Sequence, residues 1–237
     1  MVLLHYDPPM TPYLDILYRD EDIIVLNKPS GLLSVRGRAA AHFDSVQTRV
    51  QTVLPTASVV HRLDMATSGL IIMALNKAAN SALSRQFQQR EVSKTYYARV
   101  FGKPQTTRGE INLPLICDWP NRPKQMVDHD NGKPSTTQYE VVTQNTYSAL
   151  VKLTPITGRS HQLRVHMQAL GHPILGDRLY ANEQALNVSD RLLLHAHSIR
   201  FQHPVSGETL SFASPHDFNV EPDPTQHYQH QDFIKVS

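Results

Sequence analysis

A run of six apolar residues, Leu70–Leu75, is the strongest structural signal in this chain. An apolar run of this length that begins and ends at polar residues predicts a buried strand. It follows directly on a polar loop, residues 61–69 (HRLDMATSG), with Asp64 at its centre. A loop that leads straight into the core holds its side chains on a rigid support. We therefore take Asp64 as the first candidate for a functional residue.

The charges around Asp64 are unbalanced. Residues 45–109 contain nine Lys and Arg but only two acids, Asp64 and Glu91. A lone carboxylate in a basic stretch stays ionised and can act as a nucleophile or a base. The alternative is that Asp64 caps a turn or pairs with Arg62, which is the commoner use of an aspartate in a loop.

Hydrophobic alternation and turn residues predict mostly strands in hairpins. The expected strands are 14–18 and 23–27, 32–35, 70–75, 92–100, 139–142 and 147–153, and 192–201 and 208–213. Alternation within 92–100 places Tyr96 on the same face as Lys94 and Tyr97 on the opposite face.

Three helices are expected between these strands. Asp44 is the predicted N-cap of the first, Asn76 of the second and Ser160 of the third, which Gly171 ends. Hairpins interrupted by a few helices predict an α+β domain on a mixed, largely antiparallel β-sheet flanked by helices. We expect an N-terminal arm (1–13), one domain (14–217) and a polar C-terminal tail (218–237).

Composition limits the class of protein. The chain has 237 residues, 40% of them hydrophobic, enough for one large core. Its net charge is only +2, but residues 141–176 hold three cations and no acid, which predicts one cationic face. The single cysteine, Cys117, excludes an internal disulfide and fits a reducing compartment. Without a membrane-length apolar run or a signal-peptide pattern, the chain is expected to be soluble and cytoplasmic.

Two other classes of function compete with an aspartate enzyme. His195 and His197 lie two apart on an expected strand, and with Asp177 they could bind a metal in a metal-dependent hydrolase. Other histidine spacings fit no ligand pattern, and the chain has neither a P-loop nor a dinucleotide fingerprint. A non-enzymatic RNA-binding module is the third possibility.

Five motifs follow one another along the chain: Lys28–Gly31 (KPSG), residues 61–69 around Asp64, Lys94-x-Tyr96-x-Ala98, Gly158–His166 (GRSHQLRVH) and Gly171–Asp177 (GHPILGD). In this order they resemble the RluA family of pseudouridine synthases. The resemblance covers roughly residues 15–215, and the motifs together are highly specific. The resemblance implies the pseudouridine synthase fold, and it leaves no room for an S4 domain before the KPSG motif.

The resemblance also implies the chemistry. The family breaks the C1′–N1 bond of uridine, turns the uracil over and joins C1′ to C5, which requires no cofactor and no metal. Asp64 is then the catalytic residue, and it could attack C1′, add to C6 or remove the 2′ proton. The family match makes Tyr96 the tyrosine that stacks on the uracil and moves a proton, and Arg164 the partner of the catalytic aspartate. Taken alone, Tyr96 would be a half-buried strand residue and Arg164 a surface arginine on an amphipathic helix.

The implied substrate is structured RNA, with the target base flipped into a pocket. By resemblance the uridines lie in the anticodon stem-loop of tRNA (position 32) and in a stem-loop of 23S rRNA (position 746). Leu163 is expected to line the uracil pocket. Four cationic residues are assigned to substrate or RNA contacts: Arg62, Arg36, Arg38 and Lys28. Nothing in the sequence suggests an obligate dimer, so we expect a monomer.

Overall fold

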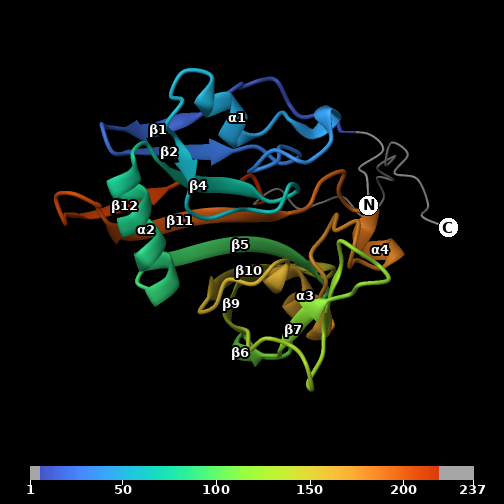
Figure 1. Ribbon diagram of the computed structural model, residues 1–237. Coiled ribbons are helices and arrows are strands. Elements are labelled where there is room, and N and C mark those ends of the chain that lie inside the picture. Colours follow the sequence, from blue (N-terminus) through green and yellow to red (C-terminus); the bar gives the residue numbers. More distant parts are fainter. Residues whose placement is uncertain (1–5, 219–237) are drawn as a thin grey trace. The chain divides into compact units, whose positions relative to one another are not determined.

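The computed structural model describes residues 6–218. This part of the chain forms two compact units. We call residues 6–94 and 196–215 the Asp64 unit, and residues 95–195 and 216–218 the Arg164 unit. The expected C-terminal tail lies outside the described residues, apart from Phe218. Figure 1 shows both units and labels their elements where there is room.

The Asp64 unit is a sheet with the strand order β1-β2-β4-β11, in which β3 also pairs with β4 and β12 with β11. The pairs β1–β2, β2–β4, β3–β4 and β11–β12 are antiparallel. The strands are β1 (Ile16–Arg19), β2 (Ile23–Lys28), β3 (Ser58–Val59), β4 (Ser68–Ala74), β11 (Leu194–Gln202) and β12 (Thr209–Ala213). The helices are the 3-10 turn η1 (Ala40–His42), α1 (Val46–Gln51) and α2 (Lys77–Gln89). The first and last expected hairpins and the apolar strand are thereby confirmed.

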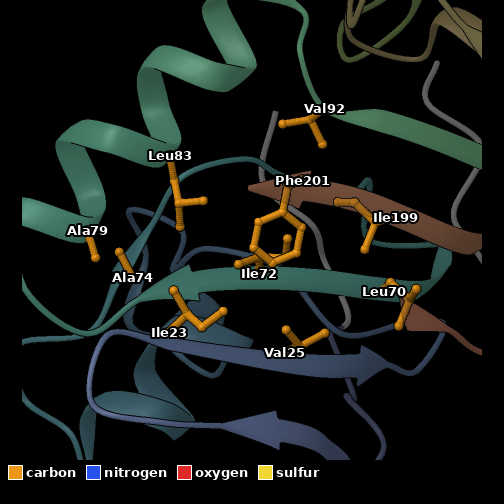
Figure 2. Packing of buried hydrophobic residues seen from close by; sticks show 10 residues of the cluster. All are labelled: Ile23, Val25, Leu70, Ile72, Ala74, Ala79, Leu83, Val92, Ile199 and Phe201. Atoms are coloured by element: carbon orange, nitrogen blue, oxygen red, sulfur yellow. The ribbon is translucent and has the colours of Figure 1, made fainter. Parts of the chain in front are cut away.

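The core of this unit lies between α2 and the sheet (Figure 2). All seven residues of β4 are buried, which explains the apolar run. Figure 2 shows Leu83 of α2 pointing toward Phe201 of β11 and Ile72 of β4. Burying a side chain of this size contributes about 1.5–3 kcal/mol. As expected, Asn76 caps α2, its side chain accepting a hydrogen bond from the Ala79 N–H.

The Arg164 unit has the strand order β5-β10-β9-β6 and a separate hairpin, β7–β8. All these pairs are antiparallel, and the expected β9–β10 hairpin is confirmed. The strands are β5 (Ser93–Phe101), β6 (Arg108–Asn112), β7 (Leu115–Cys117), β8 (Gln125–Val127), β9 (Thr136–Gln144) and β10 (Ser148–Pro155). The helices are α3 (Gln162–Ala169) and α4 (Glu183–Leu186). A small core of Leu115, Val165 and Tyr180 joins the β7–β8 hairpin to α3.

Three local expectations are wrong. Residues 32–35 form no strand. The N-cap of α1 is Ser45, not Asp44, because Ser45 and Thr48 form a reciprocal capping box while Asp44 binds Arg49. The N-cap of α3 is His161, in the left-handed conformation, and Ser160 does not cap it.

The α+β class is confirmed: sheets with antiparallel pairing carry a few helices. The longest described helix, α2, has 13 residues. No helix of residues 6–218 combines the length and the apolar character needed to cross a membrane.

Candidate active site

The loop that carries Asp64 is bound on both sides of that residue by residues 28–34. The Ser34 hydroxyl donates to the Leu63 carbonyl (2.7 Å) and accepts from the Leu63 N–H (3.0 Å). The carbonyl of Met65 accepts from the Gly31 N–H at 2.9 Å. We call these contacts, with those of Lys28 and Ser30 below, the main-chain clamp.

Lys28 and Ser30 complete the clamp. Lys28 Nζ donates to the carbonyls of Pro29 (2.9 Å), Leu32 (2.7 Å) and Met65 (3.0 Å). The Ser30 hydroxyl donates to the carbonyl of Ala66 at 2.7 Å. These contacts explain why residues 32–35 are not a strand: this segment binds the loop through side chains, and it also starts α1, whose Val46 N–H donates to the Leu33 carbonyl.

The environment of Lys28 does not fit its expected contact with RNA. Its side chain is only 1% exposed, and an ammonium has three N–H donors, all of which bind carbonyls. Burial lowers the pKa of Lys28 to about 7, and the nearby Asp64 carboxylate opposes that shift. We therefore correct its assignment: Lys28 holds the loop and places a buried cation near Asp64.

The strand after the loop fixes its other end. Asp64 is half-buried, and the carbonyl of Asp64 accepts from the Thr67 N–H at 3.1 Å, which turns the chain into β4. Gly69 has φ +109°, and a Cβ there would lie 2.3 Å from the Ala196 carbonyl oxygen of β11. Only glycine fits this position.

His61 has a structural place in the same loop. Its Nε2 accepts a hydrogen bond from the Ile72 N–H at 3.0 Å, and its ring stacks on Phe87 with centroids 4.6 Å apart. Burial and the charge of Lys94 lower the pKa of His61 to about 3, so the imidazole is neutral. A neutral, packed histidine supports the loop and carries no charge toward a substrate.

The three arginines expected at the RNA are exposed. Arg36 and Arg38 lie in the loop between β2 and α1, and Arg62 lies two residues before Asp64. The Arg36 guanidinium lies 5.6 Å from the ring centroid of Phe43. All three belong to the Asp64 unit, where they are accessible to phosphates.

Arg164 lies in the other unit and is not the surface arginine that its helical spacing alone would predict. It is 4% exposed and binds Asp177 through two hydrogen bonds, from Nε (2.7 Å) and from Nη2 (2.6 Å). Asp177 is 1% exposed, and its Oδ1 also accepts from the Leu179 N–H at 2.9 Å. A bidentate buried pair fixes the plane of the guanidinium. The expected partner, Asp64, belongs to the Asp64 unit, so that pairing stays a prediction.

Tyr180 extends this ion-pair network. The Arg164 guanidinium lies 5.0 Å from the Tyr180 ring centroid. The Tyr180 hydroxyl lies 2.7 Å from His161 Nδ1 and accepts from the Gln125 N–H at 2.8 Å. Sequence patterns suggested a role for Asp177 only as a possible metal ligand, and they suggested no role for Tyr180. Asp177 and Tyr180 lie 13 and 16 residues after Arg164, past the end of α3. Helical periodicity could not predict that they contact Arg164.

Tyr96 and Leu163 are also in the Arg164 unit. Tyr96 is half-buried on β5 opposite Leu153 of β10, and the regular register puts Tyr97 on the other face. The Tyr97 ring contacts His216 at a centroid distance of 4.6 Å. Leu163 is 7% exposed on α3.

The alternative metal set, Asp177 with His195 and His197, is not among the groups of possible metal ligands in residues 6–218. Both oxygens of Asp177 bind Arg164, and His197 donates from Nδ1 to the Ser214 carbonyl at 2.7 Å. Within residues 6–218, the group whose ligand atoms come within 4.8 Å of one another is Asp20, Asp22 and His203.

The Asp20–Asp22–His203 cluster is hydrogen bonded in a way that opposes metal binding. His203 Nδ1 accepts from the Ser206 N–H at 3.1 Å, so the proton of a neutral ring is on Nε2. Nε2 then donates to Asp20 Oδ2 at 3.0 Å. A metal at Nε2 would need the lone pair that this tautomer lacks. The cluster is therefore a polar contact between two hairpin turns.

The chain therefore has a clamped aspartate loop next to an antiparallel strand and a buried arginine in a helix. A model of the RNA pseudouridylate synthase family matches residues 22–169. The chain belongs to this family, and it is an RNA pseudouridine synthase, an isomerase.

Individual relatives agree. The dual-specificity RNA pseudouridine synthases RluA of Salmonella typhimurium (strain LT2) and Escherichia coli (strain K12) are both 58% identical to this chain over 221 residues, covering 92% of it and 100% of each relative. RluA of Vibrio parahaemolyticus is 54% identical, covering 93% of this chain and 90% of its own. The structure of human RNA pseudouridylate synthase domain containing 1 has a TM-score of 0.74 and 32% identity, covering 92% of this chain and 89% of that one.

Proposed function

We propose that this synthase isomerises uridines in two kinds of stem-loop, the anticodon stem-loop of tRNA and a stem-loop of 23S rRNA. The names of its 58% identical relatives describe dual-specificity enzymes, which supports two RNA substrates. That these substrates are tRNA and 23S rRNA is inferred from the motif resemblance. We further propose that the enzyme works as a monomer in the cytoplasm.

Asp64 is the catalytic residue in this proposal. The observation that carries it is the main-chain clamp, which binds the residues directly before and after Asp64. A loop held in this way keeps a carboxylate at a fixed position without a conformational search, which lowers the barrier for attack on a bound sugar or base. Breaking C1′–N1 and joining C1′ to C5 is an internal rearrangement, in which C5 loses a proton and N1 gains one. One ionised carboxylate with a proton acceptor is sufficient.

Arg164 orients the aspartate in this proposal. Its guanidinium is already planar, buried and held by Asp177, so it keeps one orientation through the reaction. An arginine near the catalytic carboxylate would also keep it ionised. Leu163, the neighbour of Arg164 on α3, lines the uracil pocket.

Tyr96 stacks on the flipped uracil and takes part in the late loss of the C5 proton. Tyr96→Phe keeps the ring, so stem-loop binding should change little while the step after glycosidic cleavage slows. Tyr97→Phe is the matched control, because Tyr97 is the next residue on the opposite face of β5. Equal single-turnover rates for the two variants would remove Tyr96 from this role.

The exposed Arg36, Arg38 and Arg62 contact the RNA. Arg36 and Arg38 bind phosphates, while Arg62, beside Asp64, occupies the space that the flipped base leaves. Binding should therefore weaken as salt increases, although the chain has a net charge of only +2.

Tritium release from C5-labelled uridine tests the function directly. Two synthetic RNAs, an anticodon stem-loop and a 23S rRNA stem-loop, are each incubated with the enzyme in EDTA. We expect release from both, and none from RNAs with the target uridine replaced by cytidine. Release from one RNA alone would reduce the proposal to a single substrate. Tritium release that EDTA abolishes and zinc restores would show that the isomerisation depends on a metal.

A further inference from the structure

The tip of the β7–β8 hairpin, residues 118–124, exposes the chain's only tryptophan. Trp119 is 64% exposed, the largest exposed fraction of any aromatic side chain in residues 6–218. Leaving an aromatic side chain of this size in water forgoes several kcal/mol of burial free energy. The mechanism proposed above uses no residue of this tip.

The tip has a defined structure. The Asp118 N–H donates to the Lys124 carbonyl (3.0 Å), the Asn121 N–H to the Asp118 carbonyl (3.1 Å), and the Lys124 N–H to the Asn121 carbonyl (3.0 Å). The Asn121 side chain also donates to both carboxylate oxygens of Asp118, at 3.1 and 3.0 Å. The carboxylate of Asp118, the one acidic side chain of residues 118–124, is therefore hydrogen bonded within the tip.

The base of the hairpin is fixed to the helix that carries Arg164. The Gln125 N–H donates to the Tyr180 hydroxyl at 2.8 Å, and Leu115 packs with Val165 of α3. Figure 1 shows β7 beside α3. Any ligand held at the tip is therefore held at a fixed position relative to α3.

The side chains of the tip match the chemistry of a nucleotide. The Arg122 guanidinium lies 4.6 Å from the Trp119 ring centroid, so one face of the indole carries a cation. Lys124 adds a second positive charge at the end of the same turn. A flat aromatic surface with adjacent cations binds an unpaired base by stacking and its phosphate by charge. A single exposed aromatic side chain on a hairpin tip is much smaller than a stable protein interface needs.

We propose that this tip is an RNA-binding platform, on which an unpaired loop base of the substrate stacks on Trp119 while Arg122 and Lys124 bind phosphate. This inference rests on the proposed stem-loop substrates and adds a second contact to them, on a different element from Asp64. It also predicts that the contact favours loops over continuous duplex, because paired bases offer no free face.

Intrinsic fluorescence tests the contact, since Trp119 is the only tryptophan. The Asp64→Asn protein, which should not turn over, is titrated with an anticodon stem-loop, while a 3′-labelled copy reports binding by anisotropy. We expect the Trp119 emission to be quenched with the same midpoint as the anisotropy. The isolated duplex stem should quench it much less. Anisotropy that saturates while the emission stays constant would overturn the inference.

Variants supply an independent measurement. Trp119→Ala should raise the KM for the stem-loop roughly 5- to 50-fold with little change in kcat, within the range of base–aromatic stacking. Trp119→Phe should recover most of the loss. Tyr147→Ala is the matched control, because Tyr147 is 60% exposed in the same unit and is not part of the tip.

The outcomes separate this inference from the proposed function. If the wild-type enzyme releases tritium from a stem-loop and Trp119→Ala has the same KM, the tip does not bind RNA but the function stands. If no stem-loop is modified, the proposed substrates fail first. Unchanged melting temperatures in all three variants would show that the effects on KM are not effects on folding.

Discussion

Asp64 and Arg164 are held by two different kinds of interaction. Around Asp64, side chains of residues 28–34 bind main-chain atoms of residues 63–66, so the clamp fixes the course of the backbone. Around Arg164, the carboxylate of Asp177 binds the functional side chain itself, so the pair fixes the plane of a guanidinium. The loop needs its backbone positioned because it has no regular hydrogen-bonding pattern. Arg164 already sits on a helix and needs only its flexible side chain restrained.

This difference predicts different failures. Loss of a serine of the clamp should loosen the loop and leave charges balanced. Loss of Asp177 should leave the backbone in place and remove the buried carboxylate that offsets the charge of Arg164. The following predictions test that distinction, from the largest expected effect to the smallest.

The largest effect is expected at Asp64, the residue that the clamp positions. Asp64→Asn keeps the size of the side chain and removes the carboxylate, so it should abolish pseudouridine formation, measured by tritium release. Stem-loop binding and the urea unfolding midpoint should stay near wild type. Turnover within tenfold of wild type, a barrier change of about 1.4 kcal/mol, would show that Asp64 is not catalytic.

Asp177→Asn should lower the free energy of unfolding by about 3–5 kcal/mol, because it leaves the Arg164 charge buried without its partner. Chemical denaturation measures this directly. Asp217→Asn is the matched control: Asp217 also pairs with an arginine, Arg191, but its side chain is 72% exposed. That pair should contribute at most about 1 kcal/mol.

A double variant separates stability from activity at this pair. Arg164→Met with Asp177→Leu replaces both charges by apolar groups, and it should recover much of the stability lost in Asp177→Asn. It should not recover activity. Full recovery of both would show that the pair serves only the fold.

Ser34→Ala should lower the free energy of unfolding by about 1–3 kcal/mol, because it leaves the N–H and carbonyl of Leu63 without a buried partner. Because Leu63 precedes Asp64, kcat should fall as well, and the loop amides should exchange hydrogen faster. Ser81→Ala is the control, since the exposed Ser81 hydroxyl only binds the Lys77 carbonyl within α2. Equal behaviour of the two variants would contradict the clamp.

The smallest expected effect is the change in stability over one pH unit that comes from Lys28. Its pKa is about 7 in the folded protein, against an ordinary value of 10.5, so between these pH values the unfolded chain binds more protons than the folded one. The free energy of unfolding should therefore rise with pH in this window, by at most about 1.4 kcal/mol per pH unit, and this contribution should be flat below pH 7. The three carbonyl acceptors of Lys28 stabilise its ammonium form. They therefore oppose the lowering of its pKa, so the rise in stability begins at a higher pH.

Urea unfolding of the wild type and of Lys28→Met between pH 6 and 10 isolates this contribution. The variant lacks the titrating group, so the difference between the two curves should change across the window. Parallel curves would show that Lys28 keeps the same pKa on folding.

Local patterns were sufficient for much of the fold. The apolar run predicted β4, alternation with turn residues predicted the hairpins, and Asn76 marked the start of α2 because its capping contact spans only three residues. The errors occurred where a distant partner decides. Asp44 could have capped α1 but binds Arg49, and residues 32–35 bind a loop about thirty residues later.

The identities of the candidate site residues came from motifs, and their arrangement could not be predicted from the sequence. The motifs pointed to Asp64, Tyr96 and Arg164, but charge alone suggested that Lys28 binds RNA, and burial reverses that assignment. Asp177 was a possible metal ligand only in the alternative hydrolase hypothesis, because carboxylates and histidines are common ligands. Its two hydrogen bonds to Arg164 form only when the chain turns at Gly171, where φ is +87°.

The Asp64 unit is discontinuous in the chain, and this has a consequence for synthesis. Strands β1, β2 and β4 leave the ribosome early, but β11 and β12 follow more than a hundred residues later. Until then Leu83 and Ile72 lack Phe201, and Gly69 lacks the strand that packs closely against it. The nascent chain must therefore keep the apolar β4 from associating with other chains while the Arg164 unit is being made. A ribosome stalled before residue 194 should carry a protease-sensitive Asp64 loop, although residues 61–69 have all been synthesised by then.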